Sequence, residues 1–368
     1  MRKADKKNIK KIATIVGTRP QFIKAAVVSR EIAKVYQIQE IIVHTGQHYD
    51  ANMSKIFFEE LALPRPAYNL DIGSSNHGKQ TGLMLQKIEE VLLKEEPDYV
   101  LLYGDTNSTL AGALAAVKLH IPIAHVEGGL RSYHLEYPEE VNRIVADQMS
   151  NVVFCPTRVS FQNLEKENVE KFGTKIILSG DVMQDAALFY SKKSSESSTI
   201  IKDYNLKEFI LCTIHRAEIT DDITILNSVI NALNKIHNEV PVIVPLHPRT
   251  KKVVQKNDLK LNFKVIDPVG YLDMIELLKN CKLVITDSGG LQKEAFFFKK
   301  HCATIAKYPE MEWVELYDKG YNIFAGTDQD KIYKCYKKML NRKSNFDEDL
   351  YGGGKAAKRI VKFLLNNI

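Results

Sequence analysis

The chain has 368 residues, 45% of them apolar, and a formal net charge of +6 at pH 7. Its length favours about two domains, and no apolar run approaches the roughly 20 residues of a membrane-spanning helix, so we expect no membrane partner and a cytoplasmic location. The charge excess is mild, and no basic stripe interleaved with aromatic residues indicates nucleic-acid binding. The five cysteines form no CxxC pair and are expected to stay reduced.

Short apolar runs alternate with amphipathic stretches along the first half of the chain. The runs are continuously apolar, which is typical of strands covered on both faces of a sheet. Strand, helix and strand in succession predict parallel pairing with right-handed crossovers. The predicted strands are 11–18, 40–46, 98–104, 122–128, 152–156 and 175–180, and the predicted helices are 20–35, 52–62, 79–95, 108–119 and 138–151.

The polar, serine-rich segment SKKSSESST at 191–199 has no periodicity and is the predicted linker. The alternating pattern then restarts, with strands at 209–215, 240–247, 263–268, 281–288, 301–306 and 321–326. The sequence therefore predicts an α/β protein in which two doubly wound, Rossmann-like domains face a central cleft. The expected domains are residues 1–190 and 200–351, followed by a C-terminal helix at 352–368 that could pack back on the N-terminal domain.

Polar and ionisable residues collect where the predicted strands end, which is where open α/β sheets bind ligands. Any single motif could be an ordinary turn or helix cap. Six strand ends that together carry Arg, Lys, Asp, Glu and His are hard to explain as caps alone. The segments are 17–20 with Lys24, 104–109, 125–131 with 138–140, 215–216, 247–249 and 287–290.

The segment ITDSGGLQKEA at 285–295 predicts an anion site. Ser288, Gly289 and Gly290 at a helix N-terminus would offer backbone donors, a hydroxyl and the positive end of the helix dipole. Glu294, one turn further on, would repel a phosphate and suits sugar hydroxyls better. Together they indicate a nucleoside diphosphate, with Arg19 as a possible counter-charge, although D-S-G-G also occurs as a simple turn.

No cofactor motif is present. Neither GTRPQF nor SGGLQKEA has the three-glycine dinucleotide spacing, and the chain has no P-loop, so we expect no nicotinamide cofactor. His44 and His48 are four residues apart, but a strand-to-loop crossover would not hold them on one helical face. Since no third ligand is evident, we expect no metal site.

The chain closely resembles the non-hydrolysing UDP-N-acetylglucosamine 2-epimerase family over roughly residues 11–326. The motifs that carry the resemblance are, in order, GTRPQFIKAA, GDTNSTLAGALAA, HVEGGLRS, PEEVNR, GDVMQDA, TIHRAE and TDSGGLQKEA. The resemblance implies a glycosyltransferase-B-like architecture with UDP held mainly by the C-terminal domain. It also implies an isomerase that inverts carbon 2 of a UDP-linked N-acetylhexosamine for surface polysaccharide or glycan synthesis, and a homodimer.

The proton on carbon 2 is not adjacent to a carbonyl, so simple abstraction is chemically hard. Without a dinucleotide motif, expulsion of UDP is favoured over oxidation by NAD. The family eliminates UDP in the anti sense to give 2-acetamidoglucal, then adds UDP back with a proton delivered to the opposite face. This chemistry needs carboxylates for proton transfer and donors for the departing diphosphate.

The resemblance also assigns roles to residues. Asp105, Glu127 and Glu139 match the family's catalytic acids, and His215 matches its essential histidine. We expect Asp105 and Glu127 to transfer protons, whereas Glu139 could orient the sugar or favour a helix N-terminus, and His215 could bind phosphate. The expected substrate-binding residues are Arg19, Lys24, Gln47, Arg131, Arg216, His247, Ser288, Gly289, Gly290 and Glu294.

Three departures from the family pattern matter. Gln21 replaces the glutamate of GTRPE, Ala217 replaces an arginine of HRRE, and 311–315 replaces a T-E-R-P-E segment. Lys79 stands near an arginine used by enzymes that a second UDP-N-acetylglucosamine activates, so we expect weak or no such activation. GTRPQFIKAA with EWVEL resembles the subgroup acting on UDP-2,3-diacetamido-2,3-dideoxy-glucuronate. The cations that could meet its uronate carboxylate are Arg131, Arg249 and Lys307.

Three alternatives stay open at this point. A glycosyltransferase of the same architecture would use the same nucleotide half, but the acids on the N-terminal side count against it. A hydrolysing 2-epimerase would release the free sugar and UDP. A nucleotide-sugar binding protein without activity would retain the fold alone.

Overall fold

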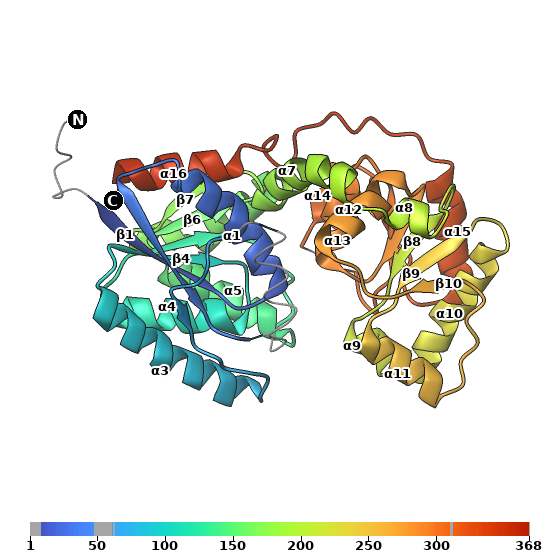
Figure 1. Ribbon diagram of the computed structural model, residues 1–368, viewed down its shortest axis with the longest axis horizontal. Helices are drawn as coiled ribbons and strands as arrows, with labels where there is room; N and C mark the ends of the chain where they lie inside the picture. Colours follow the sequence, from blue (N-terminus) through green and yellow to red (C-terminus); the bar gives the residue numbers. More distant parts are fainter. Residues whose placement is uncertain (1–8, 48–60, 62, 310–311, 368) are drawn as a thin grey trace. The chain divides into compact units, whose positions relative to one another are not determined.

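The computed structural model describes residues 9–47, 61, 63–309 and 312–367 (Figure 1). The predicted helix at 52–62 lies almost wholly outside the described residues, as do His48 and Met311. The chain divides into two compact units, the first formed by the residues up to Ala186 with those from Asp349 onward, and the second by Ala187–Glu348. No helix of the described residues has the length and apolarity to cross a membrane.

The first unit contains a seven-stranded parallel sheet in the order β3-β2-β1-β4-β5-β6-β7. Its strands are β1 (Lys10–Val16), β2 (Ile38–His44), β3 (Tyr68–Asn69), β4 (Tyr99–Tyr103), β5 (Ile123–Val126), β6 (Val152–Cys155) and β7 (Lys175–Leu178). Its helices are α1 (Arg19–Ile32), α3 (His77–Glu95), α4 (Asn107–Lys118), α5 (Pro138–Met149), α6 (Arg158–Glu167), the 3₁₀ helix η2 (Val169–Phe172), the start of α7 (Val182–Ser197), and α16 (Ala356–Asn367).

Helices cover both faces of this sheet, which explains why its strands are continuously apolar. Ala13 and Ile15 of β1 point to one face and join Met84 and Ile88 of α3 in a buried cluster. On the other face α16 packs against α1, so the last helix of the chain belongs to the first unit (Figure 1).

The second unit contains a six-stranded parallel sheet in the order β10-β9-β8-β11-β12-β13. Its strands are β8 (Ile210–Thr213), β9 (Val242–Pro245), β10 (Lys264–Ile266), β11 (Leu283–Thr286), β12 (Cys302–Thr304) and β13 (Asn322–Phe324). Its helices are the rest of α7, α8 (Ile200–Asp203), α9 (Ala217–Thr220), α10 (Ile223–His237), α11 (Pro248–Lys256), α12 (Tyr271–Asn280), α13 (Gly289–Phe297), α14 (Val314–Asp318) and α15 (Gln329–Leu340).

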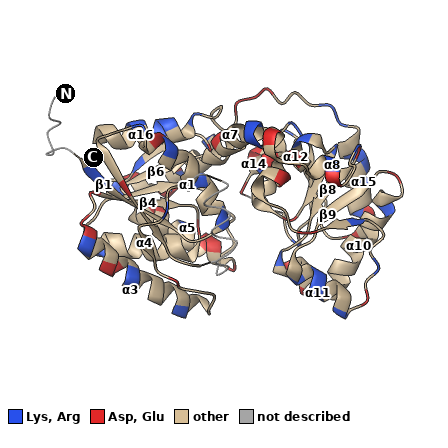
Figure 2. Cartoon of the chain, viewed as in Figure 1, with Lys and Arg blue, Asp and Glu red and all other residues tan. Residues whose placement is uncertain are grey.

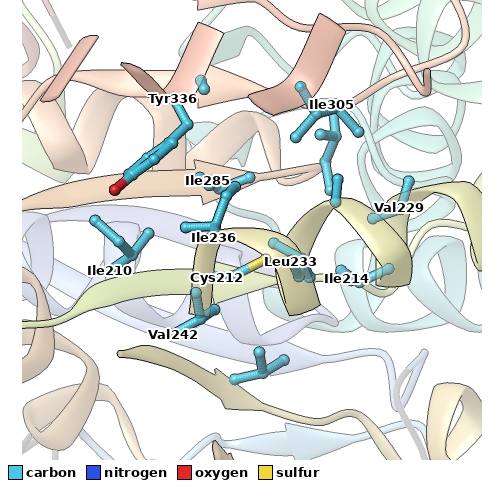
Figure 3. Packing of buried hydrophobic residues seen from close by; sticks show 14 of the residues in the cluster. Ile210, Cys212, Ile214, Val229, Leu233, Ile236, Val242, Ile285, Ile305 and Tyr336 are labelled. Carbon is cyan, nitrogen blue, oxygen red and sulfur yellow. The ribbon is translucent and has the colours of Figure 1, made fainter. Parts of the chain in front are cut away.

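Alternate residues of β8 enter two different cores. Ile210 and Cys212 pack with Leu233 of α10 and Tyr336 of α15 (Figure 3). Leu211 instead joins the cluster formed with α8, α12 and α13. This sheet is thus covered by helices on both faces. The five cysteines of the chain are free and buried.

Both sheets follow the doubly wound pattern, which confirms the predicted fold class. The strand order reverses between β1 and β4 in the first unit and between β8 and β11 in the second. The carboxyl ends of strands beside such a reversal form the usual ligand site of these folds. Gly17 and Gly104 follow the two strands in the first unit, and Ile214 and Asp287 follow those in the second.

Residues 191–197 of the serine-rich segment predicted as a linker are helical, since α7 continues to Ser197, and the division between the units falls earlier in this helix. Its serines bond back to the helix. Ser194 Oγ lies 2.9 Å from the Ser191 carbonyl oxygen, and Ser197 Oγ lies 2.7 Å from that of Lys193. Ser194 also donates to Glu276 of α12 at 2.7 Å. Local hydroxyl bonds and this tertiary contact therefore override the low helix propensity of serine.

Candidate active site

Gln21 holds the turn between β1 and α1. Its Oε1 accepts hydrogen bonds from the backbone N–H groups of Gly17 (2.8 Å) and Thr18 (3.2 Å), while its Nε2 donates to the Tyr103 carbonyl (2.8 Å) and to Thr109 Oγ1 (3.0 Å). The side chain is buried. A glutamine suits this place because it has both a donor and an acceptor end, whereas an ionised glutamate could only accept. The departure at GTRPQ is thus a structural tie from α1 to β4.

Gln47 lies against the first turn of α4. Its Oε1 accepts from Ser108 N (3.1 Å) and from Ser108 Oγ (2.7 Å). A Cβ at Gly17 would lie 2.1 Å from Thr45 Oγ1 and 2.2 Å from Ser108 Oγ, so only glycine fits there. The turns after β1 and β2 therefore pack directly on α4, and Arg19 begins α1 beside them as a partly exposed residue.

Lys24 of α1 and Glu127 of the loop after β5 form an ion pair between Nζ and Oε1. Their side chains are only 9% and 8% exposed. Glu127 has a φ of +67°, a left-handed conformation that costs energy for a residue with a side chain and that is concentrated at functional sites. The structure therefore brings together two predicted site residues that are far apart in the sequence.

Asp105 lies in the loop after β4 and contacts α5. Arg143 Nη2 donates to Asp105 Oδ2 at 2.5 Å, and Asn142 Nδ2 donates to the Asp105 carbonyl at 2.9 Å. The Asp105 side chain keeps 28% of its surface exposed, whereas that of Arg143 keeps 4%. The carboxylate is therefore held in place while one side stays accessible.

The two neighbouring glutamates of PEEVNR lie in different environments. Glu139 is exposed in the first turn of α5. Glu140 is buried and accepts from the backbone N–H groups of Ser132 (2.9 Å) and Tyr133 (2.8 Å). Glu140 therefore anchors the loop that follows β5, and Glu139 is the carboxylate that a substrate can reach.

The structure does not bring Arg131 to the surface. Its guanidinium is buried, donating from Nε to Glu167 Oε1 (2.6 Å), from Nη2 to Glu167 Oε2 (2.7 Å) and from Nη1 to Asp147 Oδ2 (2.7 Å). Buried arginines of this kind are held by paired carboxylates. Arg131 thus ties the loop after β5 to α5 and α6.

In the second unit Asp287 organises the strand ends. Asp287 is buried, and its Oδ2 accepts from the backbone N–H groups of His215 (2.6 Å) and Arg216 (2.7 Å). His215 Nδ1 lies 2.9 Å from Asp287 Oδ1, and 46% of the His215 side chain is exposed. The buried carboxylate therefore holds the backbone of the His215 loop and lies beside the ring, while nearly half of the His215 side chain stays accessible to a ligand.

The first turn of α13 contains the predicted anion site. Ser288 is the N-cap, and its Oγ accepts from Leu291 N at 3.4 Å. A Cβ at Gly289 would lie 3.3 Å from Glu312 Oε2 and 3.5 Å from Arg216 Nη2. The N-terminus of α13, with exposed Gly290 beside it, therefore lies next to the arginine of the His215 loop. Glu294 is buried one turn further along the helix.

His247 lies at the start of α11, where its Nδ1 accepts from Arg249 N at 3.2 Å. Burial lowers the pKa of His247, as do His215 and Arg249, while Asp287 acts in the opposite direction. Arg249 is exposed, and its Nη2 donates to both carboxylate oxygens of Asp221, at 2.6 and 2.7 Å. Basic side chains dominate α11, whereas α3 carries both signs of charge (Figure 2).

Sequence reasoning missed several residues of these two sites. Asn142 and Arg143 were part of PEEVNR without a role, and their position one turn after Glu139 was the available signal. Asp287 precedes the two glycines and was read only as part of the turn. In residues 9–47, 61, 63–309 and 312–367, no group of three His, Cys, Asp or Glu side chains could hold a metal ion.

These groups suit a phosphorylated sugar. The first unit offers carboxylates paired with cations, and the second offers a helix N-terminus with His215 and Arg216, which suits a diphosphate. Paired carboxylates with an anion site, on two doubly wound units, define a nucleotide-sugar enzyme of glycosyltransferase-B-like architecture. The family model described as UDP-N-acetylglucosamine 2-epimerase matches residues 30–365, and the chain belongs to this family of isomerases.

Comparison with individual proteins agrees with this assignment. The chain is 54% identical over 355 residues to the UDP-2,3-diacetamido-2,3-dideoxy-D-glucuronate 2-epimerase of Pseudomonas aeruginosa, covering 96% of this chain and 99% of that protein. It is 43% identical to the UDP-N-acetylglucosamine 2-epimerase of Methanocaldococcus jannaschii, over 96% of this chain and 98% of that protein. A crystal structure of the M. jannaschii enzyme with UDP-GlcNAc and UDP gives a TM-score of 0.89 at 42% identity, over 97% of this chain and 100% of that one.

Proposed function

We propose that the protein inverts carbon 2 of UDP-2,3-diacetamido-2,3-dideoxy-D-glucuronate without hydrolysing the nucleotide. The observation that carries this choice of sugar is the 54% identity to the Pseudomonas aeruginosa enzyme that is named for it, over nearly the whole of both chains. The same choice agrees with the GTRPQ and EWVEL segments. UDP-N-acetylglucosamine is the second candidate because of the 43% identity to the M. jannaschii enzyme.

In the proposed reaction a carboxylate takes the proton from carbon 2 while the bond between carbon 1 and the diphosphate oxygen breaks. The electron pair of the C–H bond forms the carbon–carbon double bond, and the pair of the C–O bond leaves on UDP. Addition of UDP and delivery of a proton to the opposite face complete the inversion. Asp105 and Glu127 are the proposed proton-transfer pair, with Glu139 as the third acid.

The cation pairs support these roles. Lys24 contacts Glu127 and Arg143 contacts Asp105, so each carboxylate has a cation within hydrogen-bond reach. An ionised carboxylate can accept a proton, and the same cation then favours its release, so each pair suits reversible transfer. Neither carboxylate is fully exposed, which limits competition from water.

The second unit would hold the UDP. Ser288, Gly289 and Gly290 at the start of α13 would bind the diphosphate with His215 and Arg216, since backbone donors and cations stabilise a departing phosphate. Glu294 would accept hydrogen bonds from the ribose. Arg19, Lys24, Gln47 and His247 are further proposed contacts to the substrate.

The uronate carboxylate needs its own cation. Arg131 is buried, and its Nε, Nη1 and Nη2 atoms already donate to the carboxylates of Glu167 and Asp147. Arg249 and Lys307 are exposed. We therefore assign the uronate contact to one of these two residues rather than to Arg131.

Incubation in heavy water with each of the two UDP-sugars tests the proposal. With the diacetamido-glucuronate we expect NMR to show deuterium at carbon 2 and formation of the inverted product. We also expect kcat/KM for this sugar to exceed kcat/KM for UDP-N-acetylglucosamine. A higher kcat/KM for the latter would reverse the choice of sugar. Release of UDP with free sugar would identify a hydrolysing enzyme, and transfer to an acceptor without exchange at carbon 2 would identify a glycosyltransferase.

Two further proposals rest on the resemblance alone. The enzyme would work as a homodimer in the cytoplasm, and it would show weak or no activation by a second UDP-N-acetylglucosamine. Light scattering after size exclusion measures the mass against 41.8 kDa for one chain. Initial rates with and without added UDP-N-acetylglucosamine test the activation.

A further inference from the structure

A buried charge network lies beneath the loop that carries Glu127. His125 and Asp147 are completely buried, and His125 Nδ1 lies 2.8 Å from Asp147 Oδ1. Asp147 Oδ2 accepts from Arg131 Nη1 at 2.7 Å and from the backbone N–H of Gly129 at 3.0 Å. Arg131 also pairs with Glu167. The proposed chemistry uses none of these four side chains directly.

Both ring nitrogens of His125 face acceptors. Nε2 lies 2.6 Å from the Gly104 carbonyl oxygen, which can only accept a hydrogen bond. The pKa of Asp147 is lowered, because the hydrogen bonds and charges of His125 and Arg131 outweigh the opposite effect of burial, so its carboxylate is also an acceptor. A neutral imidazole has only one N–H, whereas an imidazolium has two. The geometry therefore requires a proton on each nitrogen.

This network connects the two loops that carry the proposed acids. Gly104 immediately precedes Asp105, and its N–H donates to the Val126 carbonyl at 2.9 Å while its own carbonyl receives the His125 bond. A Cβ at Gly104 would lie 3.3 Å from Lys24 Nζ and 3.9 Å from Glu127 Oε1. The Gly104 peptide therefore separates the Lys24–Glu127 pair from Asp105, and His125 fixes that peptide.

The glycines after Glu127 rest on the same pair. A Cβ at Gly128 would lie 2.4 Å from Asp147 Oδ1 and 3.0 Å from His125 Nδ1. Gly129, with a φ of +78°, donates its N–H to Asp147. These contacts of Gly128 and Gly129 stabilise the left-handed backbone conformation at Glu127.

We propose that His125, with both ring nitrogens donating, one to Asp147 and one to the Gly104 carbonyl, is a positioning residue that sets the spacing between Asp105 and the Lys24–Glu127 pair. The proposal rests on the proposed function, since it assigns proton transfer to those two acids. His125 does not itself touch the substrate. It acts through the Gly104 carbonyl and the Gly128–Gly129 backbone, so loss of its charge affects the rate of proton transfer and leaves UDP binding in the second unit unchanged.

The protonation state is tested on the unmodified full-length protein by NMR after labelling histidine with ¹⁵N. We expect both ring nitrogens of His125 to carry protons, with the resonances assigned by their loss in His125→Gln. A resonance typical of an unprotonated ring nitrogen would overturn the proposal. This measurement does not depend on turnover, so it decides the charge state even if neither sugar is epimerised.

The positioning role is tested by kinetics of His125→Gln, His125→Asn and Asp147→Asn, with UDP affinity measured by calorimetry. A displacement of about 1 Å in a reacting group can cost about 10²-fold, so we expect kcat to fall by about that factor in His125→Asn and Asp147→Asn, with KM and UDP affinity changing less than about threefold. Glutamine can still donate to the Gly104 carbonyl, and His125→Gln should recover part of the loss.

The matched control is His120→Asn. His120 is an exposed histidine in the same unit with a φ of +58°, a conformation that asparagine tolerates, and its kinetics should equal those of the wild type. If the His125 and Asp147 variants lower the thermal midpoint but keep kcat per folded molecule, the pair is merely structural and the proposal is wrong. A wild type inactive on both sugars would instead count against the proposed function.

Discussion

The Lys24–Glu127 ion pair gives the sharpest quantitative test of the first unit. Both side chains are less than a tenth exposed, so solvent screening weakens their interaction little. Lys24→Met removes the cation and leaves the carboxylate buried without it, and loss of one partner of a buried pair costs about 3–5 kcal/mol of the free energy of unfolding. Glu127→Gln leaves the ammonium in the same position and should cost a similar amount.

The double variant separates this coupling from packing effects. In Lys24→Met/Glu127→Gln neither charge remains, so its loss of stability should be smaller than the sum of the single losses by at least about 1.5 kcal/mol. Urea unfolding followed by far-UV circular dichroism gives the three free energies. The single tryptophan of the chain, Trp313, is buried in the second unit, and its fluorescence reports that unit separately. Additivity within about 0.5 kcal/mol would refute the reasoning.

Three further predictions concern the two proposed sites and the last helix. Asp105→Asn and Glu127→Gln should each lower epimerisation, measured by NMR, by at least about 10²-fold while calorimetry shows unchanged UDP affinity; near-normal rates in both would exclude them as the proton-transfer pair. Glu294→Ala should weaken UDP binding, and unchanged affinity would remove Glu294 from the ribose. Burial raises the pKa of Asp185 to about 6 although it accepts from Ala356 N and Ala357 N at the start of α16. Since this pKa lies above the usual value of an aspartate, its contribution to stability is present at low pH and is lost as the pH rises through about 6. Because Asp185 is partly exposed, the free energy of unfolding of the wild type should fall by about 1–2 kcal/mol relative to that of Asp185→Asn between about pH 4 and pH 7. Parallel profiles of unfolding free energy against pH would contradict this.

Most of the fold could be predicted because strands covered on both faces are continuously apolar. Each predicted strand run contains a strand, with ends that differ by a few residues. The strand β3 was missed because it contains only Tyr68 and Asn69, too short for any periodicity. The helix over residues 191–197 could not be predicted because serine composition indicated a segment without regular structure, whereas the bonds from Ser194 to the helix and to Glu276 stabilise the helix there.

The chemistry-bearing motifs could be located from the sequence, but their partners could not. The Lys24–Glu127 pair joins residues 103 positions apart, and the contact between Arg143 and Asp105 spans 38 positions. Such pairs depend on which strands are neighbours in the sheet. Arg131 was expected to bind substrate because it is a charged residue near a strand end. Its partners Glu167 and Asp147, which cannot be predicted from the sequence, instead bury it in the fold.

The return of α16 to the first unit has a consequence for synthesis on the ribosome. Every residue of the second unit leaves the exit tunnel before α16 does, so the second unit can finish folding while the α1 face of the first is still uncovered. A nascent or prematurely terminated chain would therefore expose to chaperones the surface of α1 that α16 covers in the full chain. The first unit is the first to be synthesised, but the second unit is the first that can complete its fold.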